Sequence, residues 1–375
     1  MEFEKYRLSQ LLTIKNGRDY KSLGQGSVPV FGSGGYMCSV DSYLYDRPSV
    51  LLPRKGTLSN IQYYNKGPFW TVDTCYYTIV NENLVDSYYV YRYLRNLNLS
   101  GLDTGASIPS MTQKTYNGIK ILLPNLSIQH RIASILSTYD SLIENNTKRI
   151  RLLEKMAENL YKEWFSYGKI IKGGTIVRLT DIIQITRGLS YSTAEIDCEE
   201  GLDLINLKNI QAYGGFRYDG TKKFCGKYKN EQIVCEGDLV TGVTDMTQDR
   251  RTVGSVALIP KTDKLSVISA DLIKISSSIS SVFLFGMFKY GNVSKYVAQF
   301  ANGANVLHLR PKTLHNIKVL LPNPNLINKY VDIVSPMVAE MNKLYVLSEK
   351  LARQRDLLLP RLMSGKLEVK EELLE

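Results

Sequence analysis

The sequence has few of the residues on which catalytic and metal sites usually depend. Only three histidines occur among 375 residues, which leaves little material for a histidine-based triad or a metal centre. The five cysteines are an odd number without a C-x-x-C pair, so they predict neither a disulfide framework nor a zinc knuckle, and we expect reduced thiols. We therefore expect no bound metal and no cofactor.

Long apolar runs are also missing. No segment approaches the roughly 18 to 20 consecutive apolar residues that would cross a bilayer. The first residues, MEFEKYRLSQ, are charged where a signal peptide would need an apolar core. The sequence therefore predicts a cytoplasmic protein without membrane contact.

The common catalytic motifs are absent. The sequence contains no G-x-x-x-x-G-K-[ST], no G-x-G-x-x-G, no G-x-S-x-G and no H-E-x-x-H. An E-x-K triplet of the kind found in nucleases occurs at 368–370, but it lies in a charged tail with no strand to hold a metal-binding carboxylate. These absences predict a non-catalytic protein.

The residues that are present give an ordinary globular composition with excess positive charge. Hydrophobic residues make up 44% and charged residues 22% of the chain, which excludes disordered and fibrous classes. A chain of 375 residues is longer than one domain usually is, so two domains are expected. The 47 Lys and Arg against 36 Asp and Glu suggest a polyanionic partner such as nucleic acid, but charge alone does not establish one.

An internal repeat is the strongest signal in the sequence. Residues 114–125 (KTYNGIKILLPN) and 312–323 (KTLHNIKVLLPN) share eight of 12 positions at an offset of 198. Residues 6–17 (YRLSQLLTIKNG) and 177–188 (VRLTDIIQITRG) are related at an offset of 171. Because this period far exceeds that of solenoid repeats, roughly 20 to 50 residues, it indicates two duplicated domains.

Each repeat is followed by a segment with helical periodicity. Residues 127–165 carry mostly apolar residues at alternating spacings of three and four, a heptad seam with the polar Asn146 and one irregularity. A helix of this length spans roughly 58 Å and cannot bury its seam alone. Residues 326–359 carry a similar stripe that Pro336 interrupts, so we expect this helix to start late or to bend near Val334 and to end at Pro360. The two helices are expected to pair as an antiparallel coiled coil, and folding of each helix onto its own domain is the alternative.

The remaining segments predict strands. Short stretches rich in β-branched or aromatic residues, bounded by Gly, Pro or Asp, occur at 49–53, 75–80, 232–240 and 255–259. The expected fold is therefore α+β, with two sheet-rich domains each followed by a long helix. The predicted boundaries are 1–125 for the first recognition domain, 126–167 for the first helix, 168–325 for the second recognition domain, 326–365 for the second helix and 366–375 for a charged tail.

Both repeats place basic and aromatic side chains around a shared glycine, Gly17 or Gly188. Pro53-Arg54-Lys55-Gly56 enters a turn after an apolar strand, and 244–251 (TDMTQDRR) is a polar loop between two strands. Basic side chains in such turns can reach phosphates, whereas Arg or Asn in the major groove can read base edges. A solvated surface charge is the alternative for any single residue. The residues predicted to contact nucleic acid are Lys15, Arg18, Tyr20, Arg54, Lys55, Lys114, Arg187, Tyr191, Gln248, Arg250, Arg251 and Lys312.

Five segments near the predicted helices carry a family resemblance: 105–109 (GASIP), 114–124 (KTYNGIKILLP), 129–132 (QHRI), 152–165 (LLEKMAENLYKEWF) and 358–366 (LLPRLMSGK). Together with the two-domain plan, they resemble the specificity subunit of type I restriction-modification enzymes. The resemblance covers nearly the whole chain. Each segment is weak evidence alone, and the combination is fairly specific.

The resemblance implies two target-recognition domains that each read one half of a split sequence in double-stranded DNA. It also implies that the paired helices set the spacing and dock methyltransferase subunits, and that cleavage and translocation belong to restriction subunits. Because the repeats differ strongly outside their shared motifs, we expect an asymmetric target. Two other functions were considered: a coiled-coil scaffold that binds no DNA, and a remnant of a fused DNA methyltransferase, whose glycine-rich cofactor loop and N-P-P-Y-like tetrad are missing.

Overall fold

The computed structural model describes residues 2–97, 99–102, 109–165, 174–196, 198–262 and 264–369. The chain divides into two compact units: unit 1 is Met1–Asn145 with Ser348–Glu375, and unit 2 is Asn146–Leu347. Both long helices cross this division, so each unit contains part of each helix. The domain boundaries expected from the sequence stay predictions. Within the described ranges, no helix is long and apolar enough to span a membrane.

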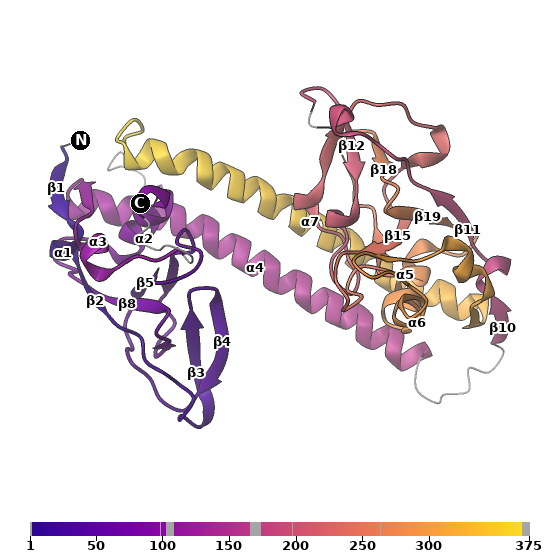
Figure 1. Cartoon of the computed structure of the whole chain (residues 1–375), viewed down its shortest axis with the longest axis horizontal. Helices are drawn as coiled ribbons and strands as arrows, with labels where there is room; N and C mark the ends of the chain where they lie inside the picture. The colour runs from indigo at the N-terminus through magenta and orange to yellow at the C-terminus, as the bar shows by residue number, and fades with distance from the viewer. Residues whose placement is uncertain are drawn as a thin grey trace. The chain divides into compact units, whose positions relative to one another are not determined.

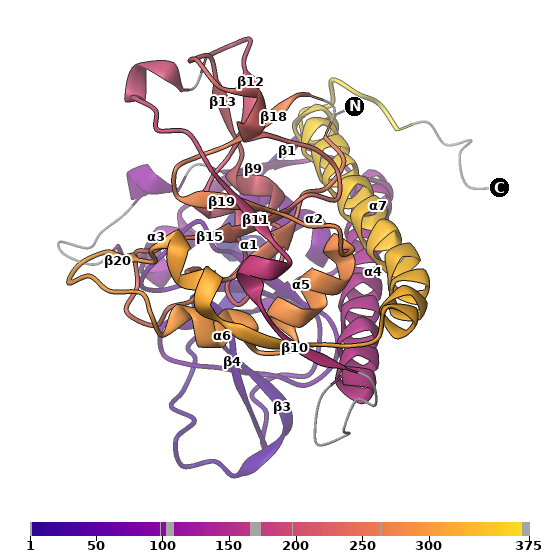
Figure 2. The same cartoon turned by 90° about the vertical axis from the view of Figure 1, so that its right-hand side faces the viewer.

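Unit 1 is built on a four-stranded antiparallel sheet in the order β2-β8-β5-β6. Every residue of β5 is buried, because α2 packs against one face and aromatic residues such as Phe69 cover the other. A second sheet, β4-β3-β7, carries the β3–β4 hairpin that projects from the unit (Figures 1 and 2). The elements are β1 (Glu4–Arg7), α1 (Leu8–Leu11), β2 (Leu12–Lys15), β3 (Gln25–Gly32), β4 (Gly35–Val40), β5 (Ser49–Pro53), β6 (Gln62–Tyr64), β7 (Trp70–Thr71), β8 (Cys75–Val80), α2 (Ser87–Asn96), α3 (Gln113–Asn117) and β9 (Lys120–Leu123).

Unit 2 repeats this plan with the sheet β11-β19-β15-β17, again antiparallel throughout. A second sheet, β13-β12-β18-β14, contains a parallel pair, β12 with β18, as β3 and β7 are in unit 1. Helices α5 and α6 pack on each other beside the main sheet (Figure 2). The elements are β10 (Thr175–Arg178), β11 (Gln184–Arg187), β12 (Leu202–Ile205), β13 (Lys222–Phe224), β14 (Ile233–Val234), β15 (Leu239–Gly242), β16 (Thr244–Asp245), β17 (Val256–Leu258), β18 (Ser266–Ile268), β19 (Leu272–Ser276), α5 (Ser281–Lys289), α6 (Val293–Ala298), β20 (Leu307–His308) and β21 (Lys318–Leu321).

The two sequence repeats fold into the same local structure. Strand β1 pairs with β9 and β10 pairs with β21, both antiparallel and in the same register. The amide of Leu8 donates to the carbonyl of Ile119 at 2.8 Å, and that of Leu179 donates to the carbonyl of Ile317 at 2.8 Å. The repeated motifs therefore close each unit by bringing its first and last strands together. The Gly105–Ile108 part of the first repeat lies outside the described residues.

Helices α4 (Leu126–Phe165) and α7 (Pro324–Met363) each contain 40 residues (Figure 1). Within unit 2, Arg149 pairs with Glu340 at 2.9 Å, and the Tyr161 and Tyr330 rings lie 5.7 Å apart. Moving forward along α4 therefore means moving backward along α7, which makes the two helices antiparallel in this unit. Packing as a regular coiled coil stays a prediction.

Two expectations from the sequence are wrong. Helix α7 begins at Pro324 rather than after Pro336, and it continues to Met363, three residues beyond Pro360. Neighbouring side chains such as Tyr330 and Val334 are buried in the core of unit 2, and this packing outweighs the hydrogen bond that Pro336 removes. Residues 232–240 form two strands and not one, because a turn with Gly237 at a φ of 85° separates β14 from β15.

A buried ionic network joins α2, α4 and α7 within unit 1. Asp140 on α4 accepts hydrogen bonds from Tyr88 at 2.5 Å, from Arg355 at 2.6 Å and from the buried guanidinium of Arg92. Burial opposes the charge of Asp140, but the hydrogen bond from Tyr88 and the two cations outweigh it and hold the pKa of Asp140 below its usual value. Arg92 is 3% exposed, so its charge depends on this carboxylate for compensation.

We predict that Asp140→Asn lowers the free energy of unfolding by roughly 3 kcal/mol at pH 7, because it leaves Arg92 as an uncompensated buried charge. A depressed pKa stabilises the folded state above the ordinary carboxyl value and loses that effect as the pH falls. The difference between the two proteins should therefore shrink below about pH 4. Urea denaturation at both pH values measures it. Glu340→Gln, which removes a more exposed pair with Arg149, is the control and should cost under about 1 kcal/mol. Equal losses in both variants would contradict the assignment.

Candidate nucleic-acid interface

The predicted basic residues of unit 1 gather around one segment, Thr71–Thr74. The amide of Arg18 donates to the carbonyl of Thr71 at 2.8 Å, and the amide of Arg54 donates to that of Thr74 at 2.8 Å. The Arg54 guanidinium also reaches the carbonyl of Asp73 at 3.4 Å. Residues that are far apart in the sequence, after β2 and after β5, are therefore anchored on the same stretch of backbone.

Helix α3 joins the same cluster. The side-chain amide of Gln113 donates to the side-chain oxygen of Asn16 at 3.0 Å, which ties α3 to the residue after Lys15. The amide of Met111 donates to the carbonyl of Arg54 at 3.0 Å. Lys15, Lys55 and Lys114 are all exposed. Unit 1 therefore brings together the basic residues that the sequence predicted, and it leaves their charges open to solvent.

The glycine shared by the two repeats allows a close backbone contact. A Cβ added to Gly17 would lie 2.0 Å from the carbonyl oxygen of Val72, and one added to Gly188 would lie 2.0 Å from that of Ser269. No other residue fits at these two points. The chain therefore passes from the main sheet across the end of the second sheet at the same place in both units.

The two predicted tyrosines are less available than the cations. Tyr20 is half-buried and packs against a small core that contains Val30 and Trp70. Tyr191 is also half-buried, and the Lys222 ammonium lies 5.7 Å from the centre of its ring. Both rings contribute to packing, so only their edges are open for recognition. Their predicted contact with DNA remains untested.

In unit 2, Arg187 is exposed at the end of β11, and the polar loop 246–252 follows β16. The loop folds around the carboxylate of Asp245, which is 2% exposed. One carboxylate oxygen accepts from the amide and the hydroxyl of Thr247, both at 2.8 Å. The other accepts from the amides of Thr252 at 2.6 Å and Val253 at 3.2 Å. Burial opposes this charge, but the hydrogen bonds outweigh it and hold the pKa of Asp245 below its ordinary value.

The side chains that this loop presents are not equally free. Met246 is 75% exposed, and Arg250 is exposed with a φ of 53°. The amide of Gln248 donates to the carbonyl of Ala304 at 2.9 Å, and Arg251 pairs with the neighbouring Asp249. Arg250 is therefore the predicted side chain of this loop that is most available to a ligand.

The Arg54 turn and the 244–251 loop occupy equivalent places in the two units. The amide of Leu309 donates to the carbonyl of Val243 at 2.8 Å, as Met111 does to Arg54. The amide of Val243 donates to the carbonyl of Asp271 at 2.8 Å, as Arg54 does to Thr74. Sequence reasoning did not relate these two segments, because their lengths and residues differ. Thr71-x-Asp73 and Ser269-x-Asp271, again offset by 198, are the signal that could have related them.

A groove beside Lys312 was also missed. It is lined by Arg310 and Lys318 and by the exposed rings of Tyr296 and Phe300, whose centres lie 5.3 Å apart. These residues belong to α6 and to the segment that leads into β21. Arg310 and Lys318 lie close to the repeat at 312–323, and a search for cations around that repeat would have found them.

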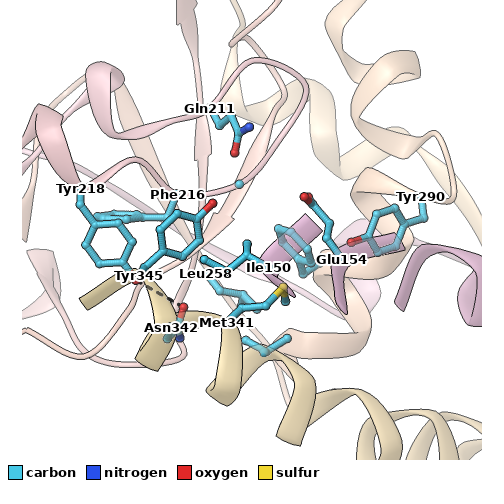
Figure 3. Close-up of a pocket in the computed structure, with 13 residues that line it drawn as sticks. Ile150, Glu154, Gln211, Phe216, Tyr218, Leu258, Tyr290, Met341, Asn342 and Tyr345 are labelled. Carbon is cyan, nitrogen blue, oxygen red and sulfur yellow. Dashed lines mark hydrogen bonds between the residues drawn. The ribbon is translucent and has the colours of Figure 1, made fainter. Parts of the chain in front are cut away.

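A small cavity in unit 2 lies where the domain meets α4 and α7. Its walls include Tyr218 and Tyr345, whose rings lie 5.2 Å apart, and the Tyr218 hydroxyl donates to Asn342 at 3.4 Å (Figure 3). The cavity holds about 70 Å³, far below the roughly 300 Å³ of a typical ligand pocket. It is a packing junction between the domain and the two helices. Over the described residues, no cluster of three or more potential metal ligands exists.

Comparison with known proteins agrees with this arrangement. Residues 1–155 match a family model described as the type I restriction modification DNA specificity domain. The chain is 22% identical to the MjaIX specificity subunit of Methanocaldococcus jannaschii, over 88% of this chain and 79% of that protein. It is 25% identical to the MjaVIII specificity subunit of the same organism, over 65% of this chain and 61% of that protein.

A relative from a bacterium and a solved structure extend the comparison. The HindI specificity subunit of Haemophilus influenzae is 21% identical, over 70% of this chain and 72% of that protein. The fold is shared with the crystal structure of a type I restriction-modification S subunit from M. genitalium, with a TM-score of 0.68, 15% identity and 96% coverage of both chains. The matched domain, the relatives along most of the chain and the common fold lead to one conclusion: the chain belongs to the specificity subunits of type I restriction-modification enzymes.

Proposed function

We propose that this chain is the sequence-specific DNA-binding subunit of a type I restriction-modification complex. One observation carries the proposal: the same scaffold occurs twice, and at the equivalent point it holds a short basic turn in unit 1 and a long polar loop in unit 2. A duplicated scaffold with different segments at one point suits a protein that reads two different half-sequences. The target is therefore bipartite and asymmetric.

The chemistry of the two segments fits a division between phosphate and base contacts. Exposed lysines such as Lys15, Lys55 and Lys114 are point charges suited to phosphates, which supply affinity without sequence choice. Arg250 at the tip of the Asp245-centred loop has the planar fork that recognises guanine in the major groove. All twelve predicted contact residues stay part of this proposal.

As a specificity subunit, the chain is non-catalytic. Methylation and cleavage then belong to its proposed partners, the methyltransferase subunits and the restriction subunits that translocate DNA. No cofactor is required for the role proposed here, and the cytoplasm, where the DNA lies, is its expected location. A scaffold that binds no DNA would not need exposed cations at matching positions of both units.

The spacing between the half-sequences provides one test. We propose that the lengths of α4 and α7 set it. Deleting one heptad from each helix, residues 143–149 and 343–349, shortens the pair by about 10 Å. The spacer of the DNA target should then shorten by about three base pairs, with both half-sequences unchanged. Methylation mapping in a host that carries the partner subunits reads all three quantities. Altered half-sequences, or an unchanged spacer, would refute the role of the helices.

The loop in unit 2 provides a second test. Asp245→Asn keeps the volume of the side chain but replaces an oxygen that accepts from Thr252 and Val253 by a donor. The loop should lose its fixed shape, and affinity for the cognate duplex should fall about tenfold, the equivalent of one or two hydrogen bonds to a charged group. Fluorescence anisotropy measures it. Asp219→Asn, which alters an exposed pair with Arg217, is the control. Selectivity should relax only in the half-sequence that unit 2 reads.

The repeat-equivalent lysines provide a third test. If Lys114 and Lys312 each hold a phosphate, replacing both by alanine should weaken binding to every duplex by a similar factor. The slope of log affinity against log salt concentration should become shallower by roughly two. Lys227→Ala with Lys261→Ala removes two other exposed charges and should leave the slope unchanged. Loss of sequence preference instead of salt dependence would show that these lysines read bases.

A further inference from the structure

The outer face of the short sheet that closes each unit carries the same exposed residues in both units. In unit 1, Arg7 of β1 stands opposite Lys120 of β9, and Lys5 stands opposite Leu122. In unit 2, Arg178 of β10 stands opposite Lys318 of β21, and Ile176 stands opposite Leu320. We call these two surfaces the closing faces. Three of their four positions are identical between the units: Arg, Lys and Leu.

Packing of the core does not account for these residues. The inward positions of the same strands, Ile121 and Val319 among them, are buried and hold the sheets on their units. The outward positions are exposed: Leu122 by 50%, Leu320 by 45% and Ile176 by 70%. The fold therefore requires the inward residues alone, and the repeated outward ones need another explanation.

The cation pairs are unfavourable in the isolated chain. Like charges directly opposite each other on neighbouring strands destabilise a sheet. Within the part of the chain that the structure describes, no carboxylate forms an ion pair with Arg7, Lys120, Arg178 or Lys318. The same arrangement occurs in both units, which indicates that an anionic partner compensates it.

The apolar residues beside the cations distinguish between kinds of partner. Leu122 borders a hollow lined by Phe3, Tyr93 and Met363, and Lys318 borders the groove that contains Tyr296 and Phe300. Burying exposed leucine and isoleucine is favourable against another apolar surface, at about 25 cal/mol per Å². A phosphate backbone offers no such surface, whereas a protein with acidic side chains around an apolar centre offers both.

We propose that each closing face is a docking site for one copy of a partner protein, so that one chain seats two identical copies. The partner presents carboxylates to the Arg–Lys pair and an apolar side chain to the leucine. This inference rests on the proposed function, in which the methyltransferase subunit is that partner. It adds a surface separate from the long helices. In each unit the closing face lies on the side away from the second sheet (Figures 1 and 2).

The test uses the full chain co-expressed with its methyltransferase subunit, and mass photometry counts the copies bound. Arg7→Glu with Lys120→Glu should weaken one of the two binding events at least tenfold and leave mainly one copy bound. Arg178→Glu with Lys318→Glu should do the same at the other site. The four substitutions together should abolish assembly. Lys227→Glu with Lys261→Glu, two exposed cations outside the closing faces, should assemble like the unaltered chain.

Leu122→Ser with Leu320→Ser separates a protein partner from DNA. Both residues are exposed, so the fold should be retained, which circular dichroism and thermal melting check. We expect this variant to lose assembly and to keep salt-dependent binding to DNA. Normal assembly by every variant would overturn the docking site alone. Normal assembly by the leucine variant with loss of DNA binding by the cation variants would mean that the faces bind phosphate. If the unaltered chain bound neither the methyltransferase subunit nor DNA, the proposed function would fail as well.

Discussion

The contact of two backbones at one glycine in each unit is the constraint on which the rest of the recognition region depends. Gly17 and Gly188 let the chain lie against a carbonyl oxygen of the second sheet, where any side chain would collide. The next amide can then donate to that sheet, as Arg18 does to Thr71. This junction sets where the main sheet ends and the second sheet begins. The recognition segments of both units start from the same geometry for that reason.

Above this junction, the two units solve the problem of order in different ways. Unit 1 holds a short turn by backbone hydrogen bonds to neighbouring strands, and the Arg54 guanidinium adds a bond of its own. Unit 2 holds a longer loop, whose amides would be unsatisfied without an internal acceptor, and Asp245 supplies it. A loop whose shape is set before binding pays less entropy when it meets its ligand. Length therefore decides which device is needed.

Much of the fold could be predicted from local pattern. The strands at Ser49–Pro53 and Cys75–Val80 are apolar runs bounded by breakers, and the structure has them with the same ends. The pairing of β3 with β7 and of β12 with β18 could not be predicted, because it joins strands far apart in the sequence. Asp245 was seen only as part of a polar loop, since its partners are mostly backbone amides, which every residue has. The predicted basic residues of unit 1 do converge, but their contact with DNA depends on a ligand that the sequence does not describe.

The anchors that hold the recognition segments have a consequence for how targets change. The hydrogen bonds that place Arg54 in unit 1 and Val243 in unit 2 run between backbone groups, and they are the same although the side chains differ. A segment of any composition can be spliced between these anchors without disturbing the scaffold. Exchange of one such segment between related genes would replace one half of the target at a single stroke. New specificities would then arise by recombination more readily than by stepwise substitution.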